Sequence, residues 1–206
     1  MDYRKVAVPF LNGLTIKKQA DLFREKFWNK SIQVEIENII DLRLKLDVIP
    51  VNGLLKLCDT DALITSNWKS IYVDYEKYLD DRYKNRLRFS LAHEIGHFIL
   101  HKDIYNSFYI KNLEDFYRLI EQIPQEQYGY LESQANKFAN HLLVPRNKLI
   151  KEENKVIKAI KENNLNDLKK IDDKTLKSYL AIPISKIFGV SEEVIEIAFS
   201  DIDIEA

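Results

Sequence analysis

The sequence predicts an α+β fold in which helices stand before and after a small antiparallel sheet. Three observations predict it. Apolar residues recur at helical spacing through most of the chain, three short strand-like runs lie together between residues 47 and 73, and the most apolar helical pattern follows them directly. With 206 residues, 46% hydrophobic and 31% charged, the chain is long enough for one core and a small appendage.

Two helices and three strands are expected before the central helix. The helices span residues 16–27 and 34–44, where apolar side chains recur every three or four positions, and the strands span Asp47–Val51, Ala62–Thr65 and Ser70–Val73. Ser66-Asn67, between the last two strands, has the composition of a hairpin turn.

A long helix is expected over residues 82–101. Asp80 and Asp81 precede it, and acidic residues are favourable at a helix N-terminus. Leu87 and Leu91 belong to one apolar stripe, but Phe89 on another side is apolar too, so the helix is apolar nearly all round. Such a helix belongs in the middle of a domain.

Two further helices and a helical tail follow. Residues 112–123 form a helix ended by Pro124, and Tyr130–Val144 form one ended by Pro145. Beyond Pro145 the pattern is Lys-rich and helical. We therefore expect a main domain over residues 1–146 and a C-terminal helical extension over residues 147–206, packed on it.

Composition excludes several classes of protein. The formal net charge is −1, from 31 basic and 32 acidic residues, so neither a nucleic acid nor an anionic membrane is expected as the main partner. Cys58 is the only cysteine, which excludes a disulfide framework and favours a reducing compartment. No apolar run reaches the ~18 residues of a membrane span, and no signal peptide begins the chain. We expect a cytoplasmic protein.

The sequence His93-Glu94-Ile95-Gly96-His97 carries the strongest chemical signal. Residues four apart are neighbours on one face of a helix, so His93 and His97 can present two imidazoles to one ion. Glu94 is then placed to reach a water held by that ion. The motif falls in the most buried-looking helix, where unpaired imidazoles and a carboxylate would be costly. The pattern therefore predicts a metal site with Glu94 as its catalytic group.

A catalytic zinc needs a third protein ligand and one open position. Glu132 is the best candidate because it borders the apolar stripe of its helix. Asn136, one turn later, could accept the free N–H of a metal-bound imidazole. His101 lies roughly 6 Å beyond His97 along the helix axis and is expected to support the site from the helix end. His141 lies about half a turn away from Glu132 in angle and is expected to face solvent.

These residues carry a resemblance. Arg88 to His101 resembles the signature helix of the ImmA/IrrE family of metallopeptidases, and Glu132 to Pro145 resembles its second motif. The resemblance covers roughly residues 10–146 and implies a zincin-like catalytic domain. It implies His93, His97 and Glu132 as ligands of Zn²⁺, with Mn²⁺ possible, and Glu94 as the catalytic acid and base. Members with a known function cleave helix-turn-helix transcriptional repressors, so a repressor is the partner that the resemblance implies.

Two departures and two alternatives stay open. The 34 residues between His97 and Glu132 make a long connection, and the tail after residue 146 is too short for the sensor domain of some members, so none is expected here. Residues 184–196 have the outline of a DNA-binding helix-turn-helix, but no Lys or Arg follows Ser191, so a phosphate-facing helix is not expected. A toxin-like or binding module that keeps the metal without cleaving is the second alternative, although a structural metal site has no use for Glu94.

Overall fold

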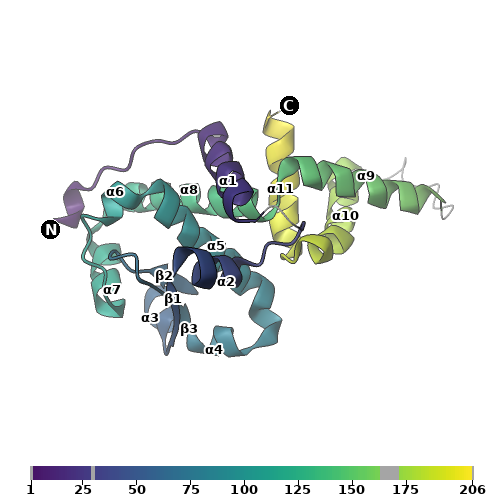
Figure 1. Ribbon diagram of the computed structural model, residues 1–206. Helices are drawn as coiled ribbons and strands as arrows, with labels where there is room; N and C mark the ends of the chain where they lie inside the picture. Colours follow the sequence, from purple (N-terminus) through teal and green to yellow (C-terminus); the bar gives the residue numbers. More distant parts are fainter. Residues whose placement is uncertain (1, 29–30, 163–171, 206) are drawn as a thin grey trace. The chain divides into compact units, whose positions relative to one another are not determined.

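The computed structural model describes residues 2–28, 31–162 and 172–205 (Figure 1). These residues form helices and one three-stranded sheet, which confirms the predicted α+β class. The chain divides into two compact units. The first takes in Met1–Asn29 and Glu35–Leu142, and the second takes in Lys30–Val34 and Leu143–Ala206. The predicted domain boundary at residue 146 stays a prediction.

The first unit contains the sheet and most of the helices. In chain order its elements are η1 (Tyr3–Lys5), α1 (Gly13–Phe27), α2 (Ile36–Ile39), the π-helical turn η2 (Ile40–Leu44), β1 (Asp47–Val51), α3 (Leu54–Cys58), β2 (Ala62–Ile64), β3 (Ser70–Asp74), α4 (Tyr75–Leu79), η3 (Asp81–Tyr83), α5 (Lys84–Leu100), α6 (Lys102–Tyr105), α7 (Leu113–Gln122) and α8 (Gln125–Leu143). The helix expected over residues 34–44 is thus realised as α2 and the π-helical turn that follows it.

The sheet is mixed, whereas an antiparallel sheet was predicted. Its strand order is β1-β3-β2. β2 and β3 form the expected antiparallel hairpin, with Leu63 opposite Tyr72, but β1 runs parallel to β3, with Val48 opposite Ile71. The reason is that α3 carries the chain from β1 to the far edge, and the hairpin then returns β3 to the middle. β2 is consequently an edge strand.

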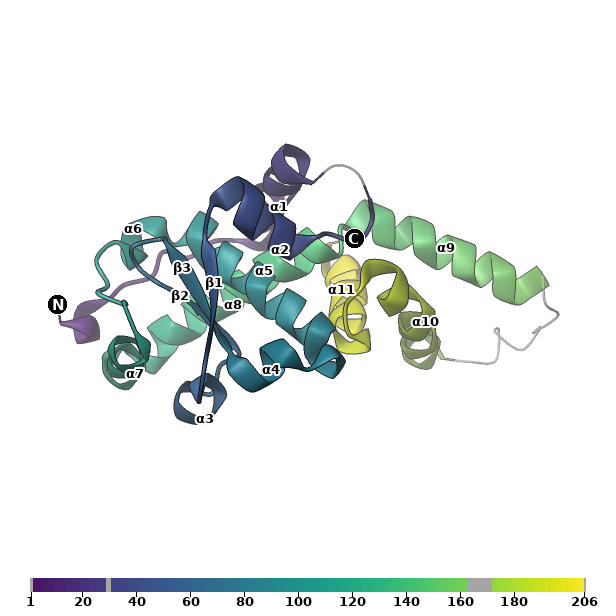
Figure 2. The same cartoon turned by 60° about the horizontal axis from the view of Figure 1, so that its bottom comes forward.

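α5 is the central helix of the first unit and lies beside β2 (Figure 2). It also contacts α1, α2 and α4, so neighbours surround it on several sides. Its buried residues accordingly occupy more than one face, as the apolar pattern predicted. The helix begins after η3, where Asp80 accepts a hydrogen bond from the backbone N–H of Arg82.

α7 lies in the long connection between His97 and Glu132, and α8 carries the second motif. α7 confirms the helix expected over residues 112–123. α8 begins at Gln125, five residues before the predicted start, and the carbonyl of Pro124 accepts from the N–H of Tyr128. The prediction that His141 faces solvent is wrong, because only 4% of it is exposed. Every residue from Phe138 to Arg146 is buried, so the end of α8 has no solvent face.

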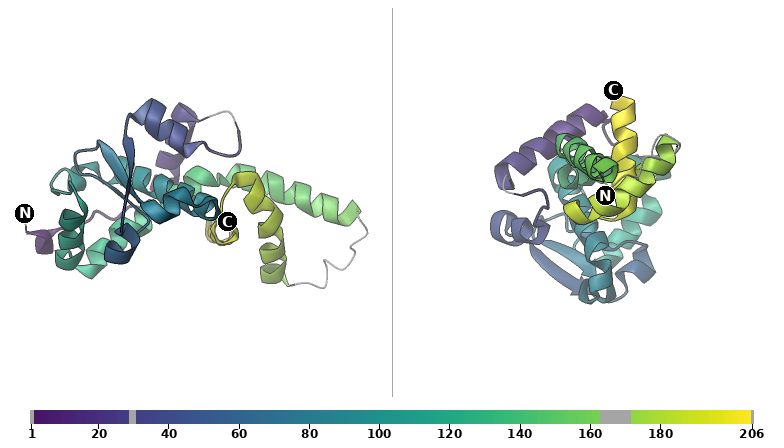
Figure 3. Two further views of the ribbon diagram at one scale, coloured as in Figure 1. Left: turned by 90° about the horizontal axis from the view of Figure 1, so that it is seen from below. Right: turned by 90° about the vertical axis from the view of Figure 1, so that its right-hand side faces the viewer.

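The described residues of the second unit form the helices α9 (Arg146–Glu162), α10 (Asp173–Phe188) and α11 (Glu192–Glu205) (Figure 3). α10 contacts both of the others. Arg146 and Asp201 form an ion pair of 2.6 Å between the start of α9 and α11. Gly189, with φ of 65°, lets the chain leave α10 in the left-handed conformation. No helix among the described residues of either unit has the length and apolar character to cross a membrane.

Candidate metal centre

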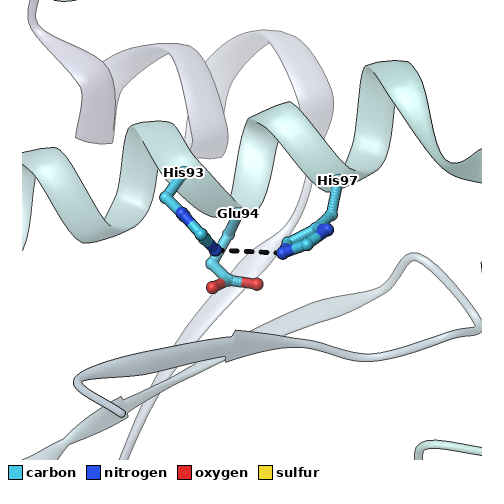
Figure 4. Close-up of side chains that lie close together, drawn as sticks. All are labelled: His93, Glu94 and His97. Carbon is cyan, nitrogen blue, oxygen red and sulfur yellow. Dashed lines mark hydrogen bonds between the residues drawn. The ribbon is translucent and has the colours of Figure 1, made fainter. Parts of the chain in front are cut away.

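Helix α5 presents His93, Glu94 and His97 together. Ligand atoms of these three side chains all lie within 4.8 Å of one another. The Nε2 atoms of the two histidines are 3.0 Å apart, and a dashed line joins the two rings in Figure 4. The helical spacing of four residues therefore brings both imidazoles to one point.

Glu132 reaches the same point from α8. Its Oε2 lies 3.2 Å from Nε2 of His93, and its Oε1 lies 3.4 Å from Nε2 of His97. The structure therefore brings together all three side chains that the sequence predicted as ligands. They come from two helices whose motifs are 34 residues apart.

The three side chains fit a divalent metal ion. Their ligand atoms are separated by 3.0–3.4 Å. Zn²⁺ binds imidazole nitrogen and carboxylate oxygen at about 2.0–2.2 Å, so tetrahedral ligands lie about 3.3–3.6 Å apart. Two nitrogens and a carboxylate are also a common donor set of catalytic zinc. His93, His97 and Glu132 would therefore hold the ion and leave a fourth position open.

Within the cluster, a proton on His93 supplies a positive charge that balances the carboxylate of Glu132. Burial, the largest influence, lowers the pKa of His93, but the hydrogen bond and the charge of Glu132 together outweigh it and raise the pKa to about 9. Burial alone would raise the pKa of Glu132, but its contacts with His93 and His97 lower it well below the ordinary value. A cationic His93 and an anionic Glu132 therefore form a partly buried ion pair.

Glu94 is held between the central helix and the edge strand. Its Oε2 accepts a hydrogen bond of 2.7 Å from the backbone N–H of Ile64 in β2. Only 4% of Glu94 is exposed, and burial raises its pKa. Arg86 of α5 and Asp61 form an ion pair just before β2, so β2 is fixed to α5 at two points. A buried carboxylate with a raised pKa suits a general base.

Neighbouring groups orient the two histidines. Asn136 Oδ1 lies 2.8 Å from Nδ1 of His93, where the sequence placed an acceptor. His101 Nδ1 lies 2.9 Å from Nδ1 of His97, on the side away from the cluster, and the ring of Tyr105 lies 5.0 Å from that of His97. Burial lowers the pKa of His101 to about 3, followed by the effect of His97. His101 therefore contacts His97 and is not one of the side chains that converge at the cluster.

Sequence reasoning missed four residues around the centre: Ile64, Tyr105, Tyr128 and Gln134. Tyr128 precedes Glu132 by one helical turn, so its position on the same face was detectable. Burial, followed by the charges of Glu132 and Glu94, raises the pKa of Tyr128. Tyr105 follows His97 by eight residues, at the spacing of one helix face, so its position was detectable as well. Ile64 and Gln134 act through contacts between segments distant in sequence, which no spacing rule reveals.

Comparison with known proteins places the chain in a family. The family model of the IrrE N-terminal-like domain, Peptidase_M78, matches residues 80–200, which is more than half of the chain. The chain therefore belongs to this family, and the predicted resemblance is confirmed. The match gives the chain a metallopeptidase-type domain and includes both α5 and α8. The comparison with curated proteins finds no match.

Proposed function

We propose that this chain is a zinc-dependent endopeptidase that cleaves a helix-turn-helix transcriptional repressor. The convergence of His93, His97 and Glu132 within 3.4 Å, with Glu94 beside them, carries the proposal. Three protein ligands are typical of a catalytic metal site and not of a structural one, because they leave one coordination position for the reaction. Zinc is the ion of choice since imidazole favours it, and manganese is the second candidate because a carboxylate also suits that ion.

Glu94 serves as the general base and acid. A bound divalent ion supplies Lewis acidity that polarises the scissile carbonyl and acidifies a water. The N–H of Ile64 holds Oε2 of Glu94, so Oε1 is the oxygen available to take the proton of that water. Glu94 then returns the proton to the leaving amine nitrogen. Its raised pKa favours both transfers near neutral pH.

An extended segment of the substrate pairs with β2. Odd-numbered residues of this strand face β3, because Asp61 accepts from the N–H of Asp74 and Thr65 donates to the carbonyl of Ser70. Ala62 and Ile64 consequently turn their backbone groups to the outer edge, beside α5. There Glu94 binds the N–H of Ile64 and the Thr60 hydroxyl binds the carbonyl of Ala62, so the Ala62 N–H and the Ile64 carbonyl are the groups we propose for pairing. Addition of a substrate strand there would place its carbonyls near Glu94 and the metal ligands.

The substrate class follows from the family resemblance. Members with a known function cleave helix-turn-helix repressors, and with such a partner we propose a cytoplasmic location for this chain. Direct DNA binding is not part of the proposal, since α11 contains no Lys or Arg. We likewise propose no membrane partner.

Two measurements test the proposal. Elemental mass spectrometry of protein purified without added metal should find near one zinc per chain. The metal-loaded protein is then incubated with helix-turn-helix repressors from the same genome, and mass spectrometry identifies any fragments. We expect one repressor to be cut by the natural protein and left whole by Glu94→Gln. Protein that takes up metal but leaves every repressor whole would instead be a non-cleaving binding module.

A further inference from the structure

A line of buried hydrogen-bonded groups leads from the metal centre to the N-terminal segment. Nδ1 of His97 lies 2.9 Å from Nδ1 of His101, and Nε2 of His101 lies 3.0 Å from Oε1 of Gln134. Nε2 of Gln134 donates over 3.0 Å to the carbonyl of Pro9. The three side chains are each at most 4% exposed. We call His97, His101, Gln134 and the Pro9 carbonyl the relay.

The carbonyl of Pro9 determines which atom donates and which accepts in every hydrogen bond of the relay. A carbonyl oxygen only accepts, so the amide group of Gln134 turns its NH₂ to Pro9 and its oxygen to His101. Nε2 of His101 must then carry a hydrogen. A buried histidine without a carboxylate partner is neutral, so Nδ1 of His101 keeps a lone pair and accepts from Nδ1–H of His97.

The direction of the hydrogen bond from His97 to His101 determines which nitrogen of His97 can bind the metal. With its hydrogen on Nδ1, His97 has a lone pair on Nε2, the atom that lies 3.0 Å from His93 and 3.4 Å from Glu132. The opposite tautomer would point an N–H at the ion and prevent coordination. The proton of His97 is therefore placed by a backbone carbonyl 88 residues earlier in the chain.

We propose that Gln134 is a positioning residue that sets the tautomers of His101 and His97 from the carbonyl of Pro9, so that the N-terminal segment is part of the metal site. The inference rests on the proposed metal centre. The inference extends the proposed metal centre, because it assigns a function to Gln134, His101 and Pro9, which lie outside the His93–His97 motif.

The chain provides its own control. α8 holds the N-terminal segment with two glutamines, since Oε1 of Gln127 accepts over 2.7 Å from the N–H of Val8. Gln127 and Gln134 thus bind neighbouring residues of the same segment, but only Gln134 also contacts His101. Gln127→Leu and Gln134→Leu each remove an anchor of the segment, and only the second interrupts the relay.

The first test reads the tautomers directly. Long-range ¹H–¹⁵N correlation spectra of metal-free, ¹⁵N-histidine-labelled protein distinguish Nδ1–H from Nε2–H rings, and the chain has only four histidines to assign. We expect His101 as the Nε2–H tautomer in the natural protein and in Gln127→Leu, and as a mixture in Gln134→Leu. An Nδ1–H ring of His101 in the natural protein, or an unchanged ring in Gln134→Leu, would overturn the proposal.

The second test measures zinc affinity by competition with a chromophoric chelator. Gln134→Leu should bind zinc about tenfold more weakly, in the range for lost partners of metal-bound histidines, and Gln127→Leu should bind as the natural protein does. If both variants bind zinc equally more weakly than the natural protein, the effect comes from loosening the N-terminal segment, and the relay is rejected. Gln134→Met repeats the measurement if the leucine variant unfolds. If the natural protein binds no zinc, the proposed function fails, whereas the tautomer test still decides the relay.

Discussion

Gly96 of α5 lies directly against Ala135 of α8. A Cβ atom added to Gly96 would lie 3.0 Å from Cα and 3.1 Å from the carbonyl oxygen of Ala135. The two helix backbones therefore touch at this point, one residue before His97 and three residues after Glu132. Gly96 thus permits the close approach of α8 to α5 that lets Glu132 reach both imidazoles.

Gly96→Ala should destabilise the metal-free protein and weaken metal binding. Forcing α8 outward by overpacking costs about 1–3 kcal/mol, against a gain of about 1 kcal/mol from alanine in a helix, so we expect a net loss of about 1 kcal/mol. Gly129→Ala is the matched control, because nothing lies within 4 Å of the added Cβ. It should stabilise the protein by about 0.5–1 kcal/mol. Urea unfolding measures both, and equal effects would contradict the close approach.

Glu94→Gln should keep the metal and lose cleavage. Glutamine preserves the size of the side chain but cannot take a proton, and general base catalysis contributes about 10²–10⁴-fold in rate. Metal content and the rate of cleavage of an identified substrate check this. Retained activity would remove Glu94 from the reaction.

Glu132→Gln should weaken zinc binding by more than about 100-fold, beyond the effect of losing an outer partner. The variant loses the charge that faces both imidazoles. Glu126→Gln, on the same helix, is the control, because Glu126 contacts Tyr130 away from the cluster. Chelator competition measures both affinities, and an unchanged value in Glu132→Gln would exclude it as a ligand.

The metal-free protein should lose stability as the pH rises from about 6.5 to about 9. The pKa of His93 is raised from 6.5 to about 9, so over this range the folded state binds a proton that the unfolded state releases. The stabilisation is complete below 6.5 and is lost through 9. Urea unfolding at pH 6, 7.5 and 9 should show it. Glu132→Gln should flatten the trend, since the raised pKa depends on Glu132, and a trend that persists would contradict this origin.

Tyr128→Phe should lower kcat and leave the metal content unchanged. The Tyr128 hydroxyl lies one turn before Glu132, is half-buried and has no hydrogen-bond partner among the described residues. It is thus available to donate to the oxyanion of the reaction, and a lost donor of this kind costs about 10²–10³-fold. Tyr130→Phe, an exposed neighbour on α8, should have no effect. Steady-state kinetics on the cleaved substrate separate kcat from KM.

The sequence predicted those parts of the site that depend on local spacing. The four-residue interval of His93 and His97 forces two imidazoles onto one helix face, and the interval of Glu132 and Asn136 does the same on α8. The structure brings all four side chains together. The hairpin of β2 and β3 was likewise predictable from its turn residues, because its contacts are local.

Features that depend on contacts between distant segments were not predictable in this way. The parallel pairing of β1 follows from the route that α3 takes, and strand direction leaves no mark in composition. His141 has the spacing of a solvent-facing residue, yet tertiary contacts bury it on the last turns of α8. The relay begins at the carbonyl of Pro9, a backbone atom that every residue has, so no side-chain pattern points to it.

The contact between Pro9 and Gln134 also has a consequence for biosynthesis. These residues are 125 positions apart in the chain, so the segment around Pro9 is synthesised well before its partner on α8. Closure of so long a loop is entropically costly and slow. A nascent chain that stops before α8 therefore carries His93 and His97 but lacks Glu132 and Gln134, so the candidate centre is completed only after α8 is synthesised.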